Sequence, residues 1–571
     1  MDPALREILA RSMPAGNIEA IVKLTAPGRI PRGLQLVTRF GDIATCRLPA
    51  ENVAEVWADE AVFSLKAPRL VSGEPLRALP GTPDEPPVST RDNPSAYTGR
   101  GVVVASVDWG FDFTHPNFLN PDGSTRFRAI WDQTAPPHPS AGRYGYGRVY
   151  DRAEIDRALQ SASPFETLGY HPAFGDPDHS GAHGTHVLDI AAGNGAAGEK
   201  GLAPEAELIG VHLSAGDTEG LATLGDSVRI LEALDFIASA VGEQPAVVNL
   251  SVGKHGGSHQ GNSLVEQGMD QFLRGKPGRA IVNSAGNYYD AQAHTSGRVP
   301  AGGRAGFEWI VDQSDRTPNE LEIWYSRRDT LRLHLTMPGE QQTAVQVDLN
   351  EKQDLVSAGK VVGRAYHRAN EPNTGDHHID IFLYRNAPKG VWRIELEGLD
   401  VVDGRFHAWI ERDSACADCQ SKFSAPDADP NFTTGSICNG LYTIAAGAYD
   451  PGDPARAPAP FSSAGPTADG RKKPNVLAPG IHIQAARSAP AAAARSGGQL
   501  CVKSGTSMAA PHVSGAIALL FEAAGQALPI ETTRRLLLSS LDPPPKNQGR
   551  DTYRYGEGYL NIPALIQTAE H

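Results

Sequence analysis

The sequence lacks a dense basic patch, a long apolar run and enough cysteines for a disulfide framework. Its formal net charge is −14, with 52 Lys and Arg against 66 Asp and Glu, which argues against nucleic acid or an anionic membrane as partner. No stretch approaches the roughly 20 apolar residues that cross a bilayer, so we expect no membrane partner. The five cysteines are few and odd in number, which fits a reducing compartment better.

The N-terminus also lacks a cationic start followed by an apolar run, so the sequence predicts no secretory signal. Leu5, Ile8 and Leu9 instead have the spacing of a short amphipathic helix. We therefore expect a cytoplasmic protein, with export by a non-classical route left open.

Five segments differ in pattern. Residues 1–72 combine the N-terminal helix with a small α+β unit, and residues 73–97 form a Pro-rich linker that cannot bury a core. Residues 98–292 and 433–571 alternate strands with helices, which predicts an α/β fold with a parallel sheet covered by helices on both faces. Residues 293–432 carry short strands separated by turn residues, which indicates an inserted all-β sandwich or jelly roll.

The strands of the α/β part are apolar almost throughout, as expected for strands buried on both faces. These strands are predicted at 102–107, 207–213, 246–250 and 280–283, with helices at 227–241 and 264–273. Three polar blocks follow such strands or open helices. Asp108 comes directly after the first strand, His183 opens a small-residue helix, and Ser507 opens an Ala-rich helix.

These blocks, Asp108-Trp109-Gly110, Ser180–Val187 and Ser504–Gly515, resemble the three signature blocks of the subtilisin-like serine proteases (subtilases, peptidase S8), in the order Asp, His, Ser. The resemblance implies a catalytic triad. A serine hydroxyl needs a neighbouring imidazole to take its proton, and a buried carboxylate holds that imidazole in the required tautomer. Ser507 is then the nucleophile, His183 the general base and acid, and Asp108 the orienting group.

A fourth block, Ile281–Asn287, is a buried strand that ends in Ala-Gly-Asn. It is similar to the family block whose asparagine donates to the oxyanion, which implies that Asn287 and the Ser507 backbone N–H form the oxyanion hole. Taken alone, this segment would be explained better by an asparagine that caps a turn, but the three triad blocks favour the oxyanion role.

Further blocks extend the resemblance over most of the α/β body. Val248–Gly253 resembles the edge strand that pairs with the substrate backbone, so Ser251, Val252 and Gly253 are expected to bind substrate. Ser284, Ala285 and Gly286 are expected to line an adjoining pocket.

Other segments resemble the bacterial Csp-type subtilases, which carry a jelly-roll domain within the catalytic domain. They are Arg126–Gln133, Tyr144–Gly147 and Ser258–Ser263. Residues 18–70 are similar to the family's propeptide, which implies an intramolecular inhibitor and self-processing between about residues 70 and 98.

The chain departs from the family at Trp109, where a small hydroxyl residue usually follows the aspartate. Cys416-x-x-Cys419 could suggest a thiol metal site, but a second ligand pair is missing and free cysteines are expected instead. No cofactor is expected to be required. Calcium as a structural ion stays open, although no acidic loop of the required pattern is present.

The resemblance implies a serine endopeptidase acting on protein or peptide substrates, made as a zymogen. Two alternatives remain at this point. One is a catalytically silent pseudoprotease that binds peptides, and the other is a peptide ligase or macrocyclase that uses the same acyl-enzyme.

Overall fold

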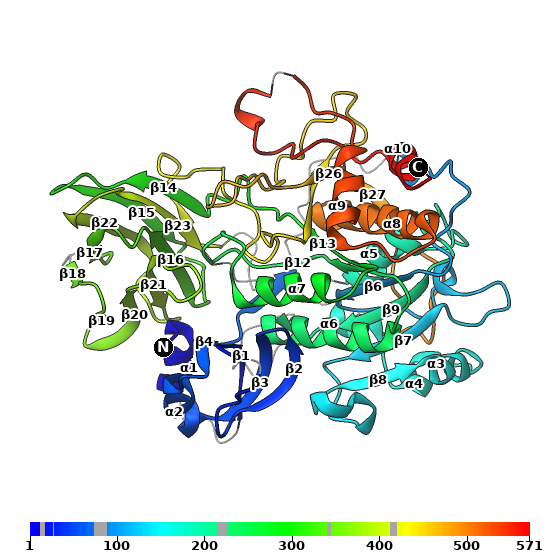
Figure 1. The fold of residues 1–571 in the computed structure, drawn as a ribbon, viewed down its shortest axis with the longest axis horizontal. Helices are drawn as coiled ribbons and strands as arrows, with labels where there is room; N and C mark the ends of the chain where they lie inside the picture. Colours follow the sequence, from blue (N-terminus) through cyan, green and yellow to red (C-terminus); the bar gives the residue numbers. More distant parts are fainter. Residues whose placement is uncertain are drawn as a thin grey trace.

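Three bodies pack against one another in the protein (Figure 1). The computed structural model describes the chain except residues 12–16, 27, 74–87, 177–178, 215–224, 340–343, 412–418, 547 and 571. The bodies are a large α/β unit, a small N-terminal unit and a β-sandwich, and the N-terminal unit contacts both of the others.

The α/β unit is built on an eight-stranded sheet with β6 (Val103–Asp108) near its centre. Every described pairing in this sheet is parallel except that of its edge strand β8 (Arg148–Asp151). The sheet order is β26 (Val476–Pro479), β25 (Ile444–Tyr449), β13 (Arg279–Ser284), β11 (Ala246–Leu250), β6, β9 (Glu207–His212), β7 (Phe127–Asp132), β8. The parallel α/β sheet expected from the sequence is therefore present, with one antiparallel edge.

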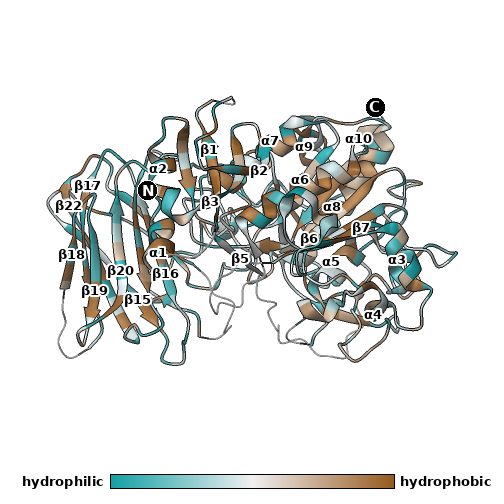
Figure 2. Ribbon diagram, turned by 90° about the horizontal axis from the view of Figure 1, so that it is seen from below, coloured by the Kyte–Doolittle hydropathy of each residue, from teal (hydrophilic) through white to brown (hydrophobic). Residues whose placement is uncertain are grey.

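Helices cover both faces of this sheet. On one face α5 (His183–Ala192) packs against α8 (Thr506–Ala524), and on the other α6 (Ser227–Val241) packs against α7 (Leu264–Gly275). The apolar strands lie between these layers (Figure 2), as their hydropathy requires. Further helices are α3 (Arg152–Leu159), α4 (Pro164–Leu168), α9 (Ile530–Ser539) and α10 (Ile562–Ala569), and a small hairpin joins β27 (Ile483–Ala486) to β28 (Leu500–Lys503).

The N-terminal unit is an antiparallel sheet in the order β2, β3, β1, β4 with two helices. Its elements are α1 (Pro3–Arg11), β1 (Asn17–Leu24), β2 (Gln35–Phe40), β3 (Ile43–Pro49), α2 (Val53–Ala58) and β4 (Val62–Lys66). Ile21, Val37 and Ile43 join the apolar core of the α/β unit, and a 2.9 Å ion pair joins Arg47 to Glu232 of α6. The unit therefore packs on the α6–α7 face.

The β-sandwich consists of a six-stranded and a five-stranded sheet, both antiparallel, that enclose their own apolar core. The six-stranded sheet has the order β14 (His294–Arg298), β23 (Arg405–Ile410), β16 (Asn319–Tyr325), β21 (His377–Leu383), β20 (Lys360–Arg368), β19 (Lys352–Ser357). The second has the order β18 (Ala344–Val347), β17 (Thr330–Thr336), β22 (Gly390–Asp400), β15 (Arg304–Val311), β24 (Lys422–Phe423).

A small third sheet joins the N-terminal unit to the α/β unit. Its middle strand, β5 (Leu70–Gly73), is antiparallel to β10 (Gly225–Asp226) on one side and to β12 (Val252–Gly253) on the other. The chain after the N-terminal unit is thus an extended strand held between two short edges of the α/β unit.

The cysteines differ from the expectation at one position. Cys419 is disulfide-bonded, so the prediction of a free cysteine there is wrong, and Cys416 lies outside the described residues. An odd cysteine count argues against complete pairing, but it does not exclude a single bond. Cys46 and Cys501 are free. Within the described ranges, no helix is long and apolar enough to cross a membrane.

Candidate active site

Asp108 and His183 meet at the carboxyl edge of the central strand. Asp108 is the last residue of β6 and is fully buried, and His183 is the first residue of α5. The His183 Nδ1–H donates to both oxygens of the Asp108 carboxylate, at 2.8 and 3.0 Å. This pairing leaves Nε2, on the opposite side of the ring, as the atom that can accept a proton.

Trp109 holds both partners of this pair. Its backbone N–H donates to Asp108 Oδ1 at 2.8 Å, and its indole stacks on the His183 imidazole. The residue that departs from the family pattern therefore supplies the carboxylate with a main-chain donor. Its ring also limits the orientations open to the imidazole.

Ser507 lies in the first turn of α8, where backbone N–H groups have no partner within the helix. Its Oγ donates to the Ser251 carbonyl at 3.4 Å, and the Ser251 hydroxyl donates back to the Ser507 carbonyl at 3.1 Å. His183 Nε2 is buried and has no hydrogen-bond partner in the described part of the chain. The serine and the imidazole are therefore not hydrogen-bonded to each other in this structure, as is common where no substrate is bound.

Asn287 is fixed by the residue that precedes the serine. Its Oδ1 accepts hydrogen bonds from the backbone N–H and the hydroxyl of Thr506, both at 3.0 Å. The amide NH2 therefore points the other way, and a Cβ on Gly505 would lie 3.3 Å from Asn287 Nδ2. A glycine before Thr506 keeps space beside the amide group.

Ser284 is the last residue of β13, Ala285 and Gly286 connect it to Asn287, and all three are buried. Gly286 has φ +109°, and a Cβ there would lie 2.7 Å from the Ser463 hydroxyl. Only glycine fits both the conformation and the space. The chain turns sharply at this point and brings Asn287 to the start of α8.

The edge of β12, which is expected to pair with substrate, is already paired with β5 of the same chain. Gly253 lies opposite Ser72 and Val252 opposite Gly73, both in β5. On the far side of β5, Gly225 and Asp226 of β10 pair with Val71 and Leu70. An extended peptide in this position is thus held by main-chain bonds on both sides.

Two other histidines beside the triad have structural contacts. His186 Nε2 lies 3.1 Å from the Ile483 carbonyl, and His512 Nδ1 lies 2.8 Å from the Met508 carbonyl. Burial lowers the pKa of His186 well below its ordinary value and that of His512 to about 4, so both are neutral near pH 7. In the part of the chain that the structure describes, no group of three His, Cys, Asp or Glu side chains could hold a metal ion.

Sequence reasoning did not identify β10 as the strand that pairs with the far side of β5, or Trp109 as a partner of His183. A two-residue strand such as Gly225–Asp226 carries no periodicity, so no local signal marks it. The aromatic type of Trp109 was visible in the sequence, but its stacking depends on how α5 packs against β6.

Comparison with known proteins places this geometry in a family. The family model described as "Subtilase family" matches residues 99–367 and 414–558, which include Asp108, His183 and Ser507. Among solved structures, the CspB protease of Clostridium perfringens matches with a TM-score of 0.69 and 23% identity, over 83% of this chain and 95% of that one. That likeness supports the overall fold.

Two curated relatives match over shorter stretches. Serine protease AprX of Bacillus subtilis is 38% identical over 109 residues, which are 18% of this chain and 24% of AprX. Subtilisin-like protease SBT2.1 of Arabidopsis thaliana is 26% identical over 274 residues, 44% of this chain and 29% of that protein. The chain thus aligns with less than a third of the length of either relative. On the family match, which covers more than half of its residues, the chain belongs to the subtilase family.

Proposed function

We propose that this protein is a serine endopeptidase that hydrolyses peptide bonds through an acyl-enzyme on Ser507. The observation that carries this proposal is the buried Asp108–His183 pair, with Nδ1 bonded to the carboxylate at 2.8 Å. Membership of the subtilase family supports the same activity.

In the proposed reaction, His183 Nε2 takes the hydroxyl proton as Ser507 Oγ attacks the substrate carbonyl carbon. The imidazolium that forms is stabilised by Asp108 and then gives its proton to the leaving amine. A water molecule, activated by the same imidazole, hydrolyses the acyl-enzyme and restores the serine. A short rotation of the Ser507 side chain, away from the Ser251 carbonyl, precedes the first proton transfer.

The negative charge on the substrate oxygen is proposed to be stabilised by two donors. One is the Asn287 amide, held in place through Thr506, and the other is the Ser507 backbone N–H in the first turn of α8. Such preorganised donors cost no reorganisation when the charge develops.

The N-terminal unit is proposed to act as an intramolecular inhibitor. Strand β5 pairs with β12, the edge expected to bind substrate, so an external peptide cannot pair there at the same time. Self-processing in the segment between about residues 70 and 98 would then leave the unit bound until it is displaced.

Fluorophosphonate labelling tests the activity. Wild type should be labelled on Ser507, and Ser507→Ala should show neither labelling nor peptide hydrolysis. The matched control is Ser539→Ala, which removes an exposed hydroxyl on α9 and should label as wild type does. Full hydrolysis by Ser507→Ala would sink the proposal. Mass analysis of the products separates hydrolysis from ligation, because a ligase joins the acyl group to an amine.

The N-terminal sequence of the purified chain tests the inhibitor. Wild type should lose its original N-terminus in a time-dependent way, whereas Ser507→Ala should keep it. An intact wild-type chain that cleaves peptides at full rate would refute the idea that the N-terminal unit blocks the cleft.

A further inference from the structure

Arg69, the residue just before β5, inserts its guanidinium among three carboxylates of the β-sandwich. Nη1 pairs with Glu320, and Nη2 lies 3.6 Å from Glu322 Oε1 and 3.4 Å from Asp380 Oδ2. We call these three acidic residues the acidic seat. They belong to β16 and β21, so a body separate from the α/β unit contacts the chain at the start of β5.

The arrangement of the acidic seat follows from strand geometry. Glu320 and Glu322 are two residues apart on β16 and point to the same face, and Asp380 lies directly opposite Glu322 on β21. Like charges directly opposite each other repel, so this face is unfavourable unless a cation lies among the carboxylates.

Burial increases the free-energy cost of ionising these carboxylates without a cation beside them. The exposed fractions of the three side chains are 17% for Glu320, 3% for Glu322 and 0% for Asp380. Asp380 Oδ1 is buried without a hydrogen-bond partner in the described ranges. Burial raises the pKa of Asp380, and the neighbouring Glu320 raises it further. Burial opposes the charge on Arg69, but the three carboxylates together raise the pKa of its guanidinium.

The main chain fixes where Arg69 sits relative to the nucleophile. The Arg69 N–H donates to the Ser227 hydroxyl and the Ser227 N–H donates to the Arg69 carbonyl, both at 3.0 Å. We number the positions of a peptide paired along β12 backwards along that peptide, starting with the position opposite Ser251 as the first. On this count Gly73 is at the second position, Ser72 at the third and Arg69 at the sixth. Because these contacts use backbone atoms of the strand, any extended peptide in the same register brings its own sixth residue to the acidic seat.

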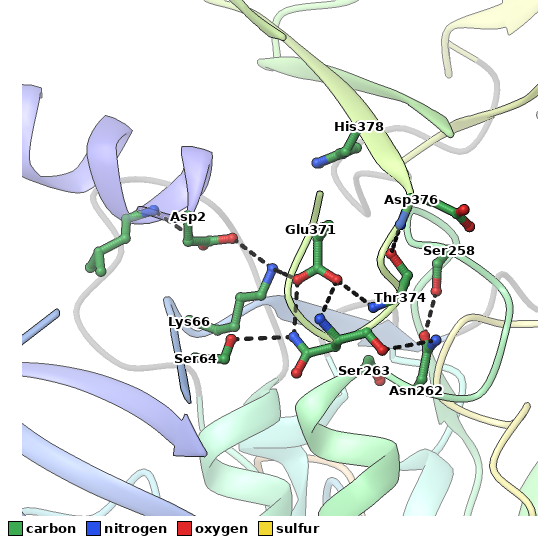
Figure 3. A network of polar contacts seen from close by, with 12 residues as sticks. Asp2, Ser64, Lys66, Ser258, Asn262, Ser263, Glu371, Thr374, Asp376 and His378 are labelled. Carbon is green, nitrogen blue, oxygen red and sulfur yellow. Dashed lines mark hydrogen bonds and ion pairs between the residues drawn. The ribbon is translucent and has the colours of Figure 1, made fainter. Parts of the chain in front are cut away.

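A second ion-pair cluster adjoins the acidic seat, and Figure 3 shows its members Asp2, Lys66 and Glu371. Lys66, at the end of β4, pairs with Asp2 and with Glu371 of the β-sandwich at 3.2 and 2.8 Å. A cavity of about 100 Å³ is lined by residues of both clusters, including Lys66, Arg69 and Glu322. The Lys66 cluster ties the N-terminal unit to the β-sandwich without involving the strand in the cleft, so it provides a matched control.

We propose that Glu320, Glu322 and Asp380 form a specificity subsite that accepts an arginine or lysine side chain at the sixth position of a peptide bound along β12. Arg69 occupies this subsite in the chain as it stands, and a basic residue of the substrate takes its place when the cleft is open. The β-sandwich thereby contributes directly to substrate choice. This inference rests on the proposed endopeptidase function and names its substrate class: extended polypeptides with a basic residue five positions before the residue opposite Ser251.

The test uses the full chain carrying Arg69→Gln, which empties the acidic seat. Internally quenched peptides that differ only at the sixth position, Arg, Lys or Gln, are compared by kcat/KM. The Arg and Lys peptides should be cleaved on the order of ten-fold faster than the Gln peptide, as expected for a buried charge-assisted pair. Adding Asp380→Asn or Glu320→Gln should reduce this ratio towards one. Adding Glu371→Gln, which alters only the Lys66 cluster, should leave the ratio unchanged.

Equal cleavage of the three peptides by Arg69→Gln, or a ratio that survives Asp380→Asn, would overturn the subsite. If no peptide is cleaved, the rate of fluorophosphonate labelling provides the readout. Arg69→Gln should then label at least about five-fold faster than wild type, because the strand is held less tightly, and Arg69→Lys should label as wild type does. Equal rates in all three chains refute the subsite while leaving an activated Ser507. Absence of labelling in every chain refutes the proposed endopeptidase function itself.

Discussion

The indole of Trp109 stacks on the imidazole of His183, with ring centroids 4.8 Å apart and planes 18° apart. Trp109 also donates its backbone N–H to Asp108, so one residue restrains both members of the pair that would activate Ser507. A substitution that keeps the backbone can therefore separate the contribution of the ring from that of the main chain.

Trp109→Leu should lower kcat about 3- to 30-fold with little change in KM. The indole face stabilises the imidazolium that forms during the reaction, and a contact of this kind contributes about 0.5–2 kcal/mol. Trp109→Phe keeps an aromatic face and should lose less. Steady-state kinetics on one peptide checks this, and equal losses in the two variants would argue against a role for the ring.

Asn287→Ala should lower kcat about 100- to 1000-fold, because a donor to the developing oxyanion is removed. KM should stay close to the wild-type value, since the same amide contributes little before the charge develops. Thr506→Ser keeps the hydroxyl that donates to Asn287 Oδ1 and serves as the control. A rise in KM at unchanged kcat would place Asn287 in substrate binding instead.

Gly286→Ala should destabilise the protein by about 2–4 kcal/mol, since the new Cβ combines a positive φ with a 2.7 Å contact to the Ser463 hydroxyl. The Ser463 hydroxyl accepts a hydrogen bond from the Tyr288 N–H at 3.0 Å, so it is held in place. Gly302 also has a positive φ, +66°, but a Cβ there would meet open space. Gly302→Ala should therefore lower the free energy of unfolding by only about 1 kcal/mol. Urea unfolding in the Ser507→Ala background measures both, and similar losses would show that the contact does not matter.

Glu266 should make stability depend on pH. Burial raises the pKa of this carboxyl from 4.5 to about 7, although hydrogen bonds from Ser263 and Asn439 oppose the rise. Between these two values the unfolded chain releases the proton while the folded chain keeps it. The free energy of unfolding should therefore fall as pH rises from about 4.5 to 7, by up to about 1.4 kcal/mol per unit, and the contribution of this group should be constant above pH 7.

Glu266→Gln retains a side chain that can complete the capping box of α7, and it removes the carboxyl group that titrates. Denaturant unfolding at several pH values, with Ser507→Ala to prevent autolysis, should show a flatter profile for Glu266→Gln over this window. Identical slopes in the two chains would mean that Glu266 is ionised in the folded protein throughout.

Much of the fold could be predicted from the sequence because apolar runs and turn residues indicate individual strands and helices locally. The apolar run before Asp108 predicted a strand buried on both faces, and β6 is such a strand at the centre of the sheet. The change to short strands after residue 292 predicted an all-β body, and the β-sandwich is that body. Helix α10 was missed, because an eight-residue helix at Ile562–Ala569 offers barely two turns of periodicity.

The sequence by itself determined the residue types and order of the Asp108, His183 and Ser507 blocks, and the strand or helix end on which each one lies. Only the tertiary structure decided that Leu70–Gly73, at the start of a Pro-rich segment, becomes a strand between β10 and β12. Likewise, the acidic seat forms around Arg69 only because β16 pairs with β21 and the β-sandwich packs against the N-terminal unit. The physical reason is that the apolar periodicity of a helix or strand is set by residues close together in the sequence. Main-chain pairing between distant edges, by contrast, uses backbone groups that every residue carries, and so leaves little mark in the sequence.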